Sequence, residues 1–217
     1  MRAKKVARLR LPTTEEQEIL VHLKVELVAP EEVARFDELI VHHHYLKNAT
    51  VVGEHLRYVA TYRGQWLALA TWSAAALHLK ARDQFIGWSE EQRRTRLPLV
   101  VNNSRLLVLP VCTCPNLISR FMKMMLGRLS EDWEGNWAHP VALAETFVDP
   151  HLYQGTAYKA SGWQRLGPTA GWKRSAEDFY QKHDRPKQIW VRELAPEAAR
   201  KLRGEELPPA WRKVQDK

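Results

Sequence analysis

The sequence has no apolar run long enough to cross a membrane. Its longest uncharged and mostly apolar stretch extends from Trp66 to Leu77, whereas a transmembrane helix needs about 20 such residues. The basic N-terminal residues MRAKKVARLR are followed by acidic, helix-like sequence instead of the apolar core of a signal peptide. We therefore expect a cytoplasmic protein that has no membrane partner.

Cysteine is scarce, and this scarcity argues against a structural metal. The two cysteines, Cys112 and Cys114, have a C-x-C spacing, and no second pair is present to complete a zinc cage. The three consecutive histidines His42 to His44 lack the i, i+3 or i+4 spacing that directs helical side chains toward one ion. We therefore predict no metal site, and we expect one of these histidines to line a pocket together with Tyr45.

Apolar residues are abundant enough for one substantial core. The 217 residues are 45% hydrophobic and 27% charged, and no segment has low complexity. We predict one main domain over residues 30–195. A basic arm with short elements precedes it over residues 1–29, and a basic tail follows over residues 196–217.

Positive charge and tryptophan are concentrated toward the C-terminal end. The net charge is +8, and the last 59 residues hold 14 Lys and Arg against 8 Asp and Glu. Basic residues next to tryptophans suit a surface that follows phosphates and stacks on bases. The alternative is a soluble basic protein whose tryptophans lie in the core. Our candidates for nucleic-acid contact in this part of the chain are Trp172, Lys173, Arg174 and Lys213.

Apolar patterns predict an α/β protein with a mixed sheet. The stretches His55 to Tyr62 and Trp66 to Trp72 flank a two-residue turn and predict an antiparallel hairpin. A strand over Arg105 to Leu109, a helix that opens at Asn116 and a strand over Val141 to Val148 predict a parallel β-α-β unit. We therefore expect a sheet with an antiparallel front half and a more parallel back half, flanked by helices.

Several side chains are candidates for proton transfer. Glu145 lies inside an apolar strand, where a carboxylate must be paired, hydrogen-bonded or raised in pKa, so it is the first candidate for a general acid or base. Asp149 precedes a proline and either caps the following turn or joins the site. His44 and Tyr45 follow a predicted helix and complete the catalytic candidates.

Other polar residues are candidates for binding an anion. Asn116, Ser119 and Arg120 lie in the first turn of a predicted helix, where free backbone N–H groups suit a phosphate, although a plain helix cap fits equally well. Arg82 and Asp83 lie beside aromatic residues and form either a structural ion pair or a substrate clamp. We include Arg82 among the nucleic-acid-binding candidates.

The order of strand, anion-facing helix, strand, helix and the closing Ser161-Gly162-Trp163-x-x-Leu166-Gly167 resembles the second half of the GNAT acyltransferase fold. In that fold the helix N-terminus holds the cofactor pyrophosphate. The usual Arg/Gln-x-x-Gly-x-Gly/Ala loop is absent here, and Pro110-Val-Cys-Thr-Cys-Pro-Asn116 stands in its place. The cofactor is therefore left open: acyl-coenzyme A is a candidate, and the missing loop argues against it.

Seven short phrases over about residues 30 to 195 form a second pattern: His44-Tyr45-Leu46, Leu56-Arg57-Tyr58, Arg82-Asp83-x-x-Ile86-Gly87-Trp88, Val101-Asn-Asn-x-Arg105, Asn116-Leu117-x-Ser119-Arg120, Glu145-Thr-Phe-Val-Asp149 and Gly155-Thr-x-Tyr158. As a set they resemble the phrases of the DruA family. Its members are named for the Druantia anti-phage system, and similar proteins occur beside or fused to transposases. The resemblance implies phage defence or mobile-element biology and contact with nucleic acid.

Two functions from different classes follow. In the first, the protein is a GNAT-like transferase acting on DNA or a nucleotide: Asn116, Ser119 and Arg120 hold an anionic group, and Glu145 or a histidine handles the proton. In the second, it is a non-catalytic DNA-binding accessory subunit that works with a partner helicase, nuclease or transposase. The missing glycine loop favours the second function. Convergence of Glu145, Asp149, Arg82 and Asp83 on one cleft would favour the first.

Overall fold

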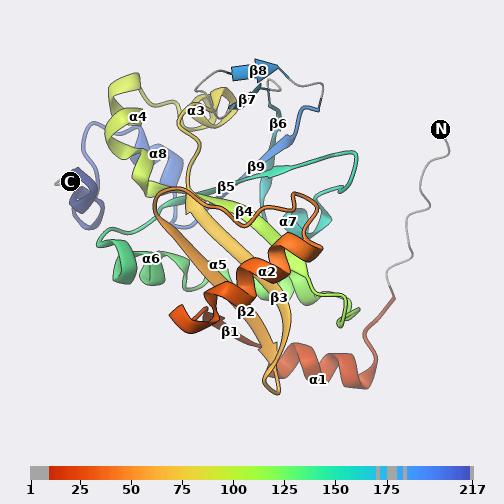
Figure 1. Cartoon of the computed structure of the whole chain (residues 1–217). Coiled ribbons are helices and arrows are strands. Elements are labelled where there is room, and N and C mark those ends of the chain that lie inside the picture. The colour runs from red at the N-terminus through yellow and green to blue at the C-terminus, as the bar shows by residue number, and fades with distance from the viewer. Residues whose placement is uncertain (1–9, 170–171, 175–179, 183–184, 216–217) are drawn as a thin grey trace.

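The chain folds around one seven-stranded sheet with the strand order β1-β2-β3-β4-β5-β9-β6, and β7 and β8 form a separate hairpin (Figure 1). The structure is a computed structural model that describes residues 10–169, 172–174, 180–182 and 185–215. Its elements in chain order are α1 (Thr14–His22), β1 (Lys24–Leu27), η1 (Pro30–Glu32), α2 (Val33–His43), β2 (His55–Tyr62), β3 (Gln65–Ala74), α3 (Lys80–Ile86), α4 (Glu90–Arg96), η2 (Leu97–Leu99), β4 (Val100–Val108), α5 (Leu117–Leu126), α6 (Leu129–Trp137), β5 (Leu143–Val148), α7 (Thr156–Ala160), β6 (Gln164–Pro168), β7 (Trp172–Arg174), β8 (Tyr180–Lys182), β9 (Gln188–Glu193), α8 (Ala198–Leu202) and η3 (Pro209–Gln215).

The front half of the sheet is antiparallel, as predicted. Strands β1 to β4 pair in sequence order, and β2 has the bounds that the alternating pattern indicates. Strand β3 is buried along most of its length, which explains its almost continuous apolar sequence. The hairpin of β2 and β3 therefore provides the rigid platform on which the rest of the sheet is built.

The back half contains the parallel pair that the β-α-β pattern predicts. Strand β4 pairs with β5 only through Val100, Val101 and Asn102, which lie opposite Leu143, Ala144 and Glu145. Beyond these three pairs the two strands separate. Strand β9 then joins β5 in antiparallel orientation, and β6 joins β9 in the same way. The predicted mixed sheet is confirmed. Among the strand pairs of this sheet that the structure describes, β4 and β5 are parallel and the others are antiparallel.

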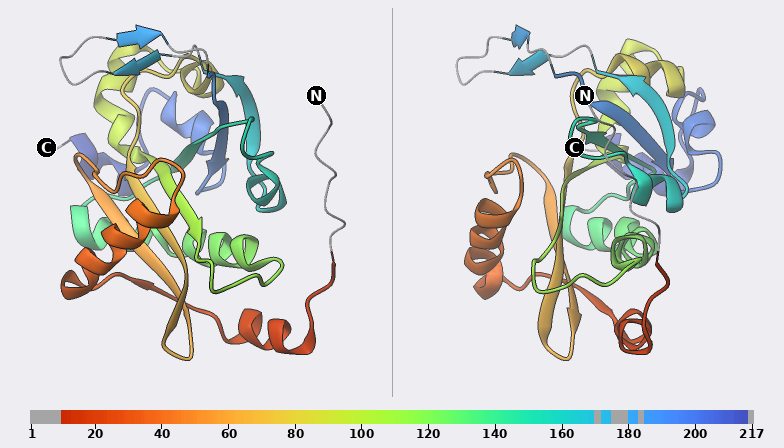
Figure 2. Two further views of the ribbon diagram at one scale, coloured as in Figure 1. Left: turned by 45° about the vertical axis from the view of Figure 1, so that its right-hand side comes forward. Right: turned by 90° about the vertical axis from the view of Figure 1, so that its right-hand side faces the viewer.

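Helices cover both faces of the front strands. On one face, Phe36 and Ile40 of α2 pack on Val59, Trp66 and Leu69. On the opposite face, the apolar side of α5 packs on β2, β3 and β4 within the largest apolar cluster. Figure 2 shows the two layers of helices on either side of the sheet. The end of α2 and the start of α5 therefore reach the gap between β4 and β5 from opposite faces.

The C-terminal segment packs against the domain that precedes it. Leu202, Leu207, Trp211 and Val214 are buried in one apolar cluster that also contains Leu99 and other residues of the earlier chain. The guanidinium of Arg96 donates to the backbone carbonyls of residues 202, 204 and 205. The predicted domain boundary at residue 195 stays a prediction. Within the described part of the chain, no helix has both the length and the apolar character that spanning a bilayer requires.

Candidate functional site

A cleft of about 480 Å³ opens where β4 and β5 separate. On the α2 side it is lined by His43, His44 and Tyr45, which end or follow that helix. On the α5 side it is lined by Ile118 and by Tyr158 of α7. Elements on both faces of the sheet therefore contribute side chains to this one cleft.

Local backbone irregularity shapes one wall of the cleft. The register between β3 and β4 shifts between Thr71 and Trp72, which face Arg105 and Asn103, so Ser104 is an extra residue. Such a bulge bends the strand and interrupts the regular ladder. The Asn103 amide donates at 3.2 Å to the carbonyls of Thr71 and Arg105 and closes the bulge. The cleft is therefore a consequence of how β4 bends.

His44 is a neutral hydrogen-bond donor in this cleft. Its side chain is buried, and its Nδ1 lies 3.3 Å from the backbone N–H of Leu46. Because Nδ1 accepts this hydrogen bond, the proton of the neutral ring belongs on Nε2. Burial, together with the positive charges of Arg105 and Lys187, lowers the pKa of His44 to about 4. The ring therefore stays uncharged at neutral pH and offers an N–H group.

Tyr45, Tyr153 and Asp149 form the rest of the α2-side wall. The rings of Tyr45 and Tyr153 lie edge to face with centroids 5.6 Å apart, and the His44 and Tyr45 centroids are 4.6 Å apart. Asp149 is buried, and its Oδ1 accepts from the backbone N–H of His151 at 2.9 Å. Asp149 thus caps the following turn and also lines the cleft, and its catalytic role stays a prediction.

Three residues that sequence reasoning did not select, Asn103, Thr146 and Tyr158, contribute to the opposite wall. The Tyr158 hydroxyl donates to Asn103 Oδ1 at 2.7 Å, and the Thr146 hydroxyl donates to the Asn103 carbonyl at 2.9 Å. Burial raises the pKa of Tyr158, so its phenol stays protonated at neutral pH. Tyr158 and Asn103 both belong to the DruA-like phrases, which is the signal that could have identified them.

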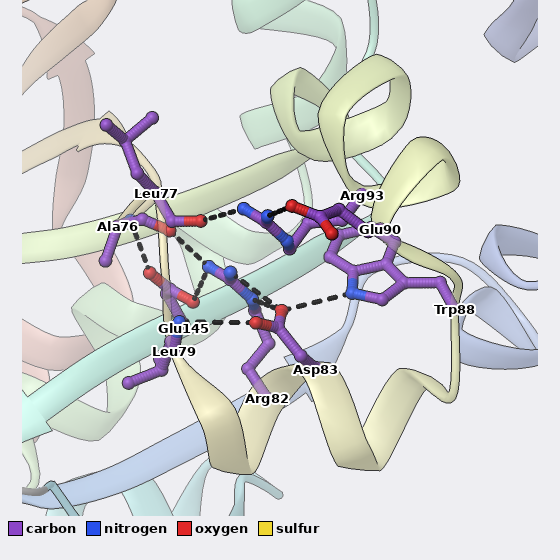
Figure 3. A network of polar contacts seen from close by, with 9 residues as sticks. All are labelled: Ala76, Leu77, Leu79, Arg82, Asp83, Trp88, Glu90, Arg93 and Glu145. Atoms are coloured by element: carbon purple, nitrogen blue, oxygen red, sulfur yellow. Dashed lines mark hydrogen bonds and ion pairs between the residues drawn. The ribbon is translucent and has the colours of Figure 1, made fainter.

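Glu145 lies outside the cleft in a buried ion-pair network (Figure 3). It is fully buried, and its carboxylate accepts from Arg82 Nη1 at 3.0 Å and from the backbone N–H of Ala76 at 2.8 Å. Burial raises the pKa of the Glu145 carboxyl, and the charge of Arg82 offsets part of that rise. Both carboxylate oxygens of Glu145 accept hydrogen bonds. Glu145 does not line the cleft that contains His44, Tyr45 and Asp149. We revise its expected role from proton transfer to structure.

Arg82 needs the corresponding correction as a candidate for nucleic-acid contact. Its side chain is fully buried and is paired with Glu145 and, at 2.8 Å, with Asp83. Trp88 also donates to Asp83 at 3.1 Å (Figure 3). A guanidinium enclosed in this way cannot reach a phosphate on the surface. Of the two alternatives from the sequence, the structure supports the structural ion pair.

The other nucleic-acid candidates lie at the C-terminal end. Lys213 is exposed on η3 and pairs with Glu134 at 2.5 Å. Trp172, Lys173 and Arg174 form strand β7, and their side chains lie outside the described part of the structure. Their contact with nucleic acid stays a prediction.

The predicted anion-binding residues line a second cavity, which we call the α5 groove. Asn116, Ser119 and Arg120 border this groove, and Lys123 and Arg192 add two further positive charges to it. Its volume is about 1000 Å³. Asn116 adopts a left-handed backbone conformation with φ of 65° and makes no side-chain cap hydrogen bond, which argues against the plain-cap alternative. At the start of α5 the Leu117 N–H donates to the Cys114 carbonyl at 3.4 Å, and the Arg120 N–H donates to the Asn116 carbonyl at 2.9 Å. Anion binding by the groove stays a prediction.

The loop before α5 carries both cysteines as free thiols. Burial raises the pKa of the Cys114 thiol to about 11, and the nearby Cys112 contributes to this rise. Cys114 is therefore a neutral thiol at pH 7 and a weak nucleophile or metal ligand. Within the described residues, no three His, Cys, Asp or Glu side chains come together to hold a metal ion.

The arrangement of strands and helices is similar to that of aminoglycoside acetyltransferases. AAC(6')-Ib in complex with ribostamycin and coenzyme A superposes with a TM-score of 0.53 and 17% identity, over 85% of this chain and 99% of that chain. The complex of the same enzyme with coenzyme A gives a TM-score of 0.52 and 17% identity, over 81% and 96% of the two chains. These likenesses show a GNAT-like fold. No curated protein sequence matches the chain.

The sequence itself matches a family model over almost its whole length. The model for Druantia protein DruA covers residues 4–204. This range contains the walls of the cleft and the whole α5 groove. The chain therefore belongs to the DruA family.

Proposed function

We propose that the protein is a GNAT-like transferase of phage defence or mobile-element systems that modifies DNA or a nucleotide. The observation that carries this proposal is the cleft between β4 and β5, which is lined from both faces of the sheet. A transfer reaction needs a donor and an acceptor at one point, and holding both in a defined geometry is a large part of catalysis. Membership of the DruA family supports the biological setting.

The side chains of the cleft supply complementary proton chemistry. His44 offers an N–H group that stabilises negative charge developing on an oxygen or a leaving group. The protonated Tyr158 hydroxyl donates to Asn103 in this structure and would turn from Asn103 to the substrate to do the same. Asp149 is the one carboxylate among the described residues that line the cleft, so we assign it the proton-accepting role that the sequence assigned to Glu145. Tyr45 and Tyr153 exclude water from the α2 side.

The α5 groove fits an anionic donor molecule by charge. Asn116, Ser119 and Arg120 would hold its phosphates, with Lys123 and Arg192 nearby. An acyl-coenzyme A in this position would supply an activated acyl group for transfer. The positive charges of the groove provide the attraction that glycine-loop amides provide in other proteins.

A second candidate function is supported by the loop before α5. Residues 110–115 contain no glycine, and Cys112 of this loop is buried. Without glycine the backbone cannot approach a pyrophosphate as closely. On this basis the chain is a non-catalytic DNA-binding accessory subunit that uses its basic residues to hold DNA for a partner helicase, nuclease or transposase.

A binding titration with a transfer readout separates the two functions. Purified protein is titrated with single- and double-stranded DNA over a salt series, with and without acetyl-coenzyme A, and the recovered DNA is analysed by mass spectrometry. A transferase predicts cofactor binding and a mass increase that Tyr158→Phe reduces by about a hundredfold. DNA binding that is independent of the cofactor and produces no adduct supports the accessory subunit. The absence of DNA binding contradicts the accessory subunit and leaves a free nucleotide as the transferase's acceptor.

A further inference from the structure

The α2 side of the cleft carries three neighbouring aromatic rings that are inclined to one another by 38° and 60°. His44, Tyr45 and Tyr153 have neighbouring rings, and Tyr153 remains half exposed although its neighbours are covered. The face of the half-exposed Tyr153 ring can stack on one planar ring, and stacking of this kind tolerates any nucleobase. An aliphatic ligand would bury apolar surface here but could not stack. The surface therefore favours a planar heterocycle.

The polar groups beside this surface form one donor and one acceptor. His44 offers Nε2–H, because its Nδ1 already accepts from Leu46. Asp149 offers Oδ2, because its Oδ1 already accepts from the backbone N–H of His151. A ring that carries an amino group next to a ring nitrogen or a carbonyl matches this pair: the amine donates to Asp149, and the neighbouring acceptor receives the His44 proton.

Positive charge lies next to the same surface. Arg105 is close enough to Tyr45 and His44 to affect both of their pKa values. It is half buried, and its Nε and Nη1 donate to backbone carbonyls of Asn48 and Ser104 at 2.8 Å, which fixes the guanidinium in place. A fixed guanidinium disfavours a cationic amine as ligand and favours a ligand with a phosphate.

From these contacts we infer that the α2 side of the cleft binds an amino-bearing nucleobase, with Asp149 recognising the exocyclic amine and His44 the neighbouring acceptor atom. The inference rests on the proposed function and names the acceptor class for that reaction. A cleft of about 480 Å³ holds one nucleotide. In DNA the base must therefore be unpaired or rotated out of the helix to enter.

The test measures base preference at equilibrium. The deoxynucleoside monophosphates dAMP, dCMP, dGMP and dTMP are titrated by calorimetry, and dTMP is the matched ligand without an exocyclic amine. We expect the amino-bearing nucleotides to bind at least about tenfold more tightly than dTMP, because a hydrogen bond to a charged group contributes about 1.5–3 kcal/mol. Single-stranded and duplex oligonucleotides with one central adenine in a thymine run then distinguish free nucleotide from DNA as the source.

Two substitutions locate the preference. In Asp149→Asn the side-chain oxygen stays on the His151 N–H, so the new NH₂ group faces the ligand amine and the preference over dTMP is lost. Tyr153→Ala removes stacking and weakens all four nucleotides by a similar factor. Glu26→Gln, an acid-to-amide change on the exposed side of β1, leaves binding unchanged.

The results that overturn the inference are equally defined. Equal affinity for all four nucleotides, an undiminished preference in Asp149→Asn, or no binding of any nucleotide or oligonucleotide each contradicts it. The wild-type series alone is decisive if Asp149→Asn fails to fold. If acetyl-coenzyme A binds and its acyl group is transferred to an acceptor that is not a base, this inference is wrong and the proposed transferase function stands. If the protein prefers amino-bearing bases but transfers nothing, the inference stands and the proposed transferase function is wrong.

Discussion

At the scale of single residues, two carboxylates four positions apart have different surroundings. Glu145 is enclosed with Arg82 and the Ala76 amide, whereas Asp149 follows the end of β5 and lines the cleft. A strand sends neighbouring side chains to opposite faces, and the chain leaves this pattern once the strand ends. One carboxylate is therefore enclosed by its ion pair, and the other borders a cavity.

The ion pair of Arg82 and Glu145 gives the first prediction. Because both side chains are fully buried, Arg82→Met leaves an uncompensated carboxylate and should lower the free energy of unfolding by about 3–5 kcal/mol. Glu145→Gln should also destabilise the fold. The double variant Arg82→Met, Glu145→Leu should lose less than the sum of its single changes. Urea unfolding followed by tryptophan fluorescence measures all three.

A surface pair provides the control for this cycle. Arg200 and Glu197 form an exposed pair on α8, so Arg200→Met should leave the unfolding midpoint nearly unchanged. Additive losses in the Arg82 and Glu145 cycle would contradict the coupling. A Glu145→Gln variant that is as stable as the wild type but inactive would restore Glu145 as a catalytic candidate.

His44 gives a prediction about pH. Its folded-state pKa of about 4 is below the ordinary value of 6.5, so the unfolded chain binds the proton more readily. The stability that neutral His44 contributes is complete above pH 6.5 and is lost as the pH falls toward 4. The shift corresponds to about 3 kcal/mol, and solvent screening at the cleft reduces this to about 2 kcal/mol.

The measurement compares the wild type with His44→Gln, which does not titrate. Unfolding free energies of both proteins are determined between pH 7 and 4.5, where the difference isolates this one group from the other histidines. The wild type should lose more stability than the variant as the pH falls. If the unfolding free energies of the two proteins depend on pH in the same way, His44 binds its proton equally in the folded and the unfolded chain.

At the scale of elements, α7 depends on a glycine. Gly155 precedes this helix with φ of +71°, and a Cβ there would lie 2.7 Å from the buried ring of Trp190. Gly155→Ala should therefore combine backbone strain of about 1–2 kcal/mol with an overpacking cost of about 1–3 kcal/mol. Thermal unfolding measures the sum. The change should also displace Tyr158, which lies on α7 in the wall of the cleft.

Gly64 is the matched control for this prediction. It has φ of +77° in the turn between β2 and β3, and a Cβ there would meet no atom within 4 Å. Gly64→Ala should therefore show only the backbone strain. If Gly155→Ala and Gly64→Ala lose equal stability, Trp190 moves aside without cost. If Gly155→Ala loses more, Trp190→Phe should restore part of its stability.

Elements were easier to predict from the sequence than the site was. The bounds of β2 follow from alternation and a tight turn, which are local properties. The first residues of β4 were missed because the polar residues Asn102 to Ser104 interrupt its apolar pattern. The cleft depends on the separation of β4 from β5, and the role of Glu145 depends on Arg82, 63 positions away. Such contacts are set by tertiary packing, which single-sequence patterns do not contain.

At the scale of the whole molecule, the C-terminal segment closes a core that begins near the middle of the chain. Trp211 is buried in a cluster that includes Trp88 and Leu202. The guanidinium of Arg96 donates to the backbone carbonyls of residues 202, 204 and 205. In this structure the segment is thus packed on the preceding domain. Its charges are therefore presented from a fixed surface, where Lys213 is already paired with Glu134.

This packing gives the last prediction. Trp211→Ala removes a large buried side chain and should lower the free energy of unfolding by about 3–5 kcal/mol. Lys213→Ala, two residues away and exposed, should change it little, so the pair separates packing from charge. Urea titration of both variants gives the comparison, and a single transition is expected because the segment shares its apolar cluster with residues near β4. A separate early transition that Trp211→Ala alone shifts would instead show that the segment unfolds independently, and the nucleic-acid surface would then belong to a movable tail.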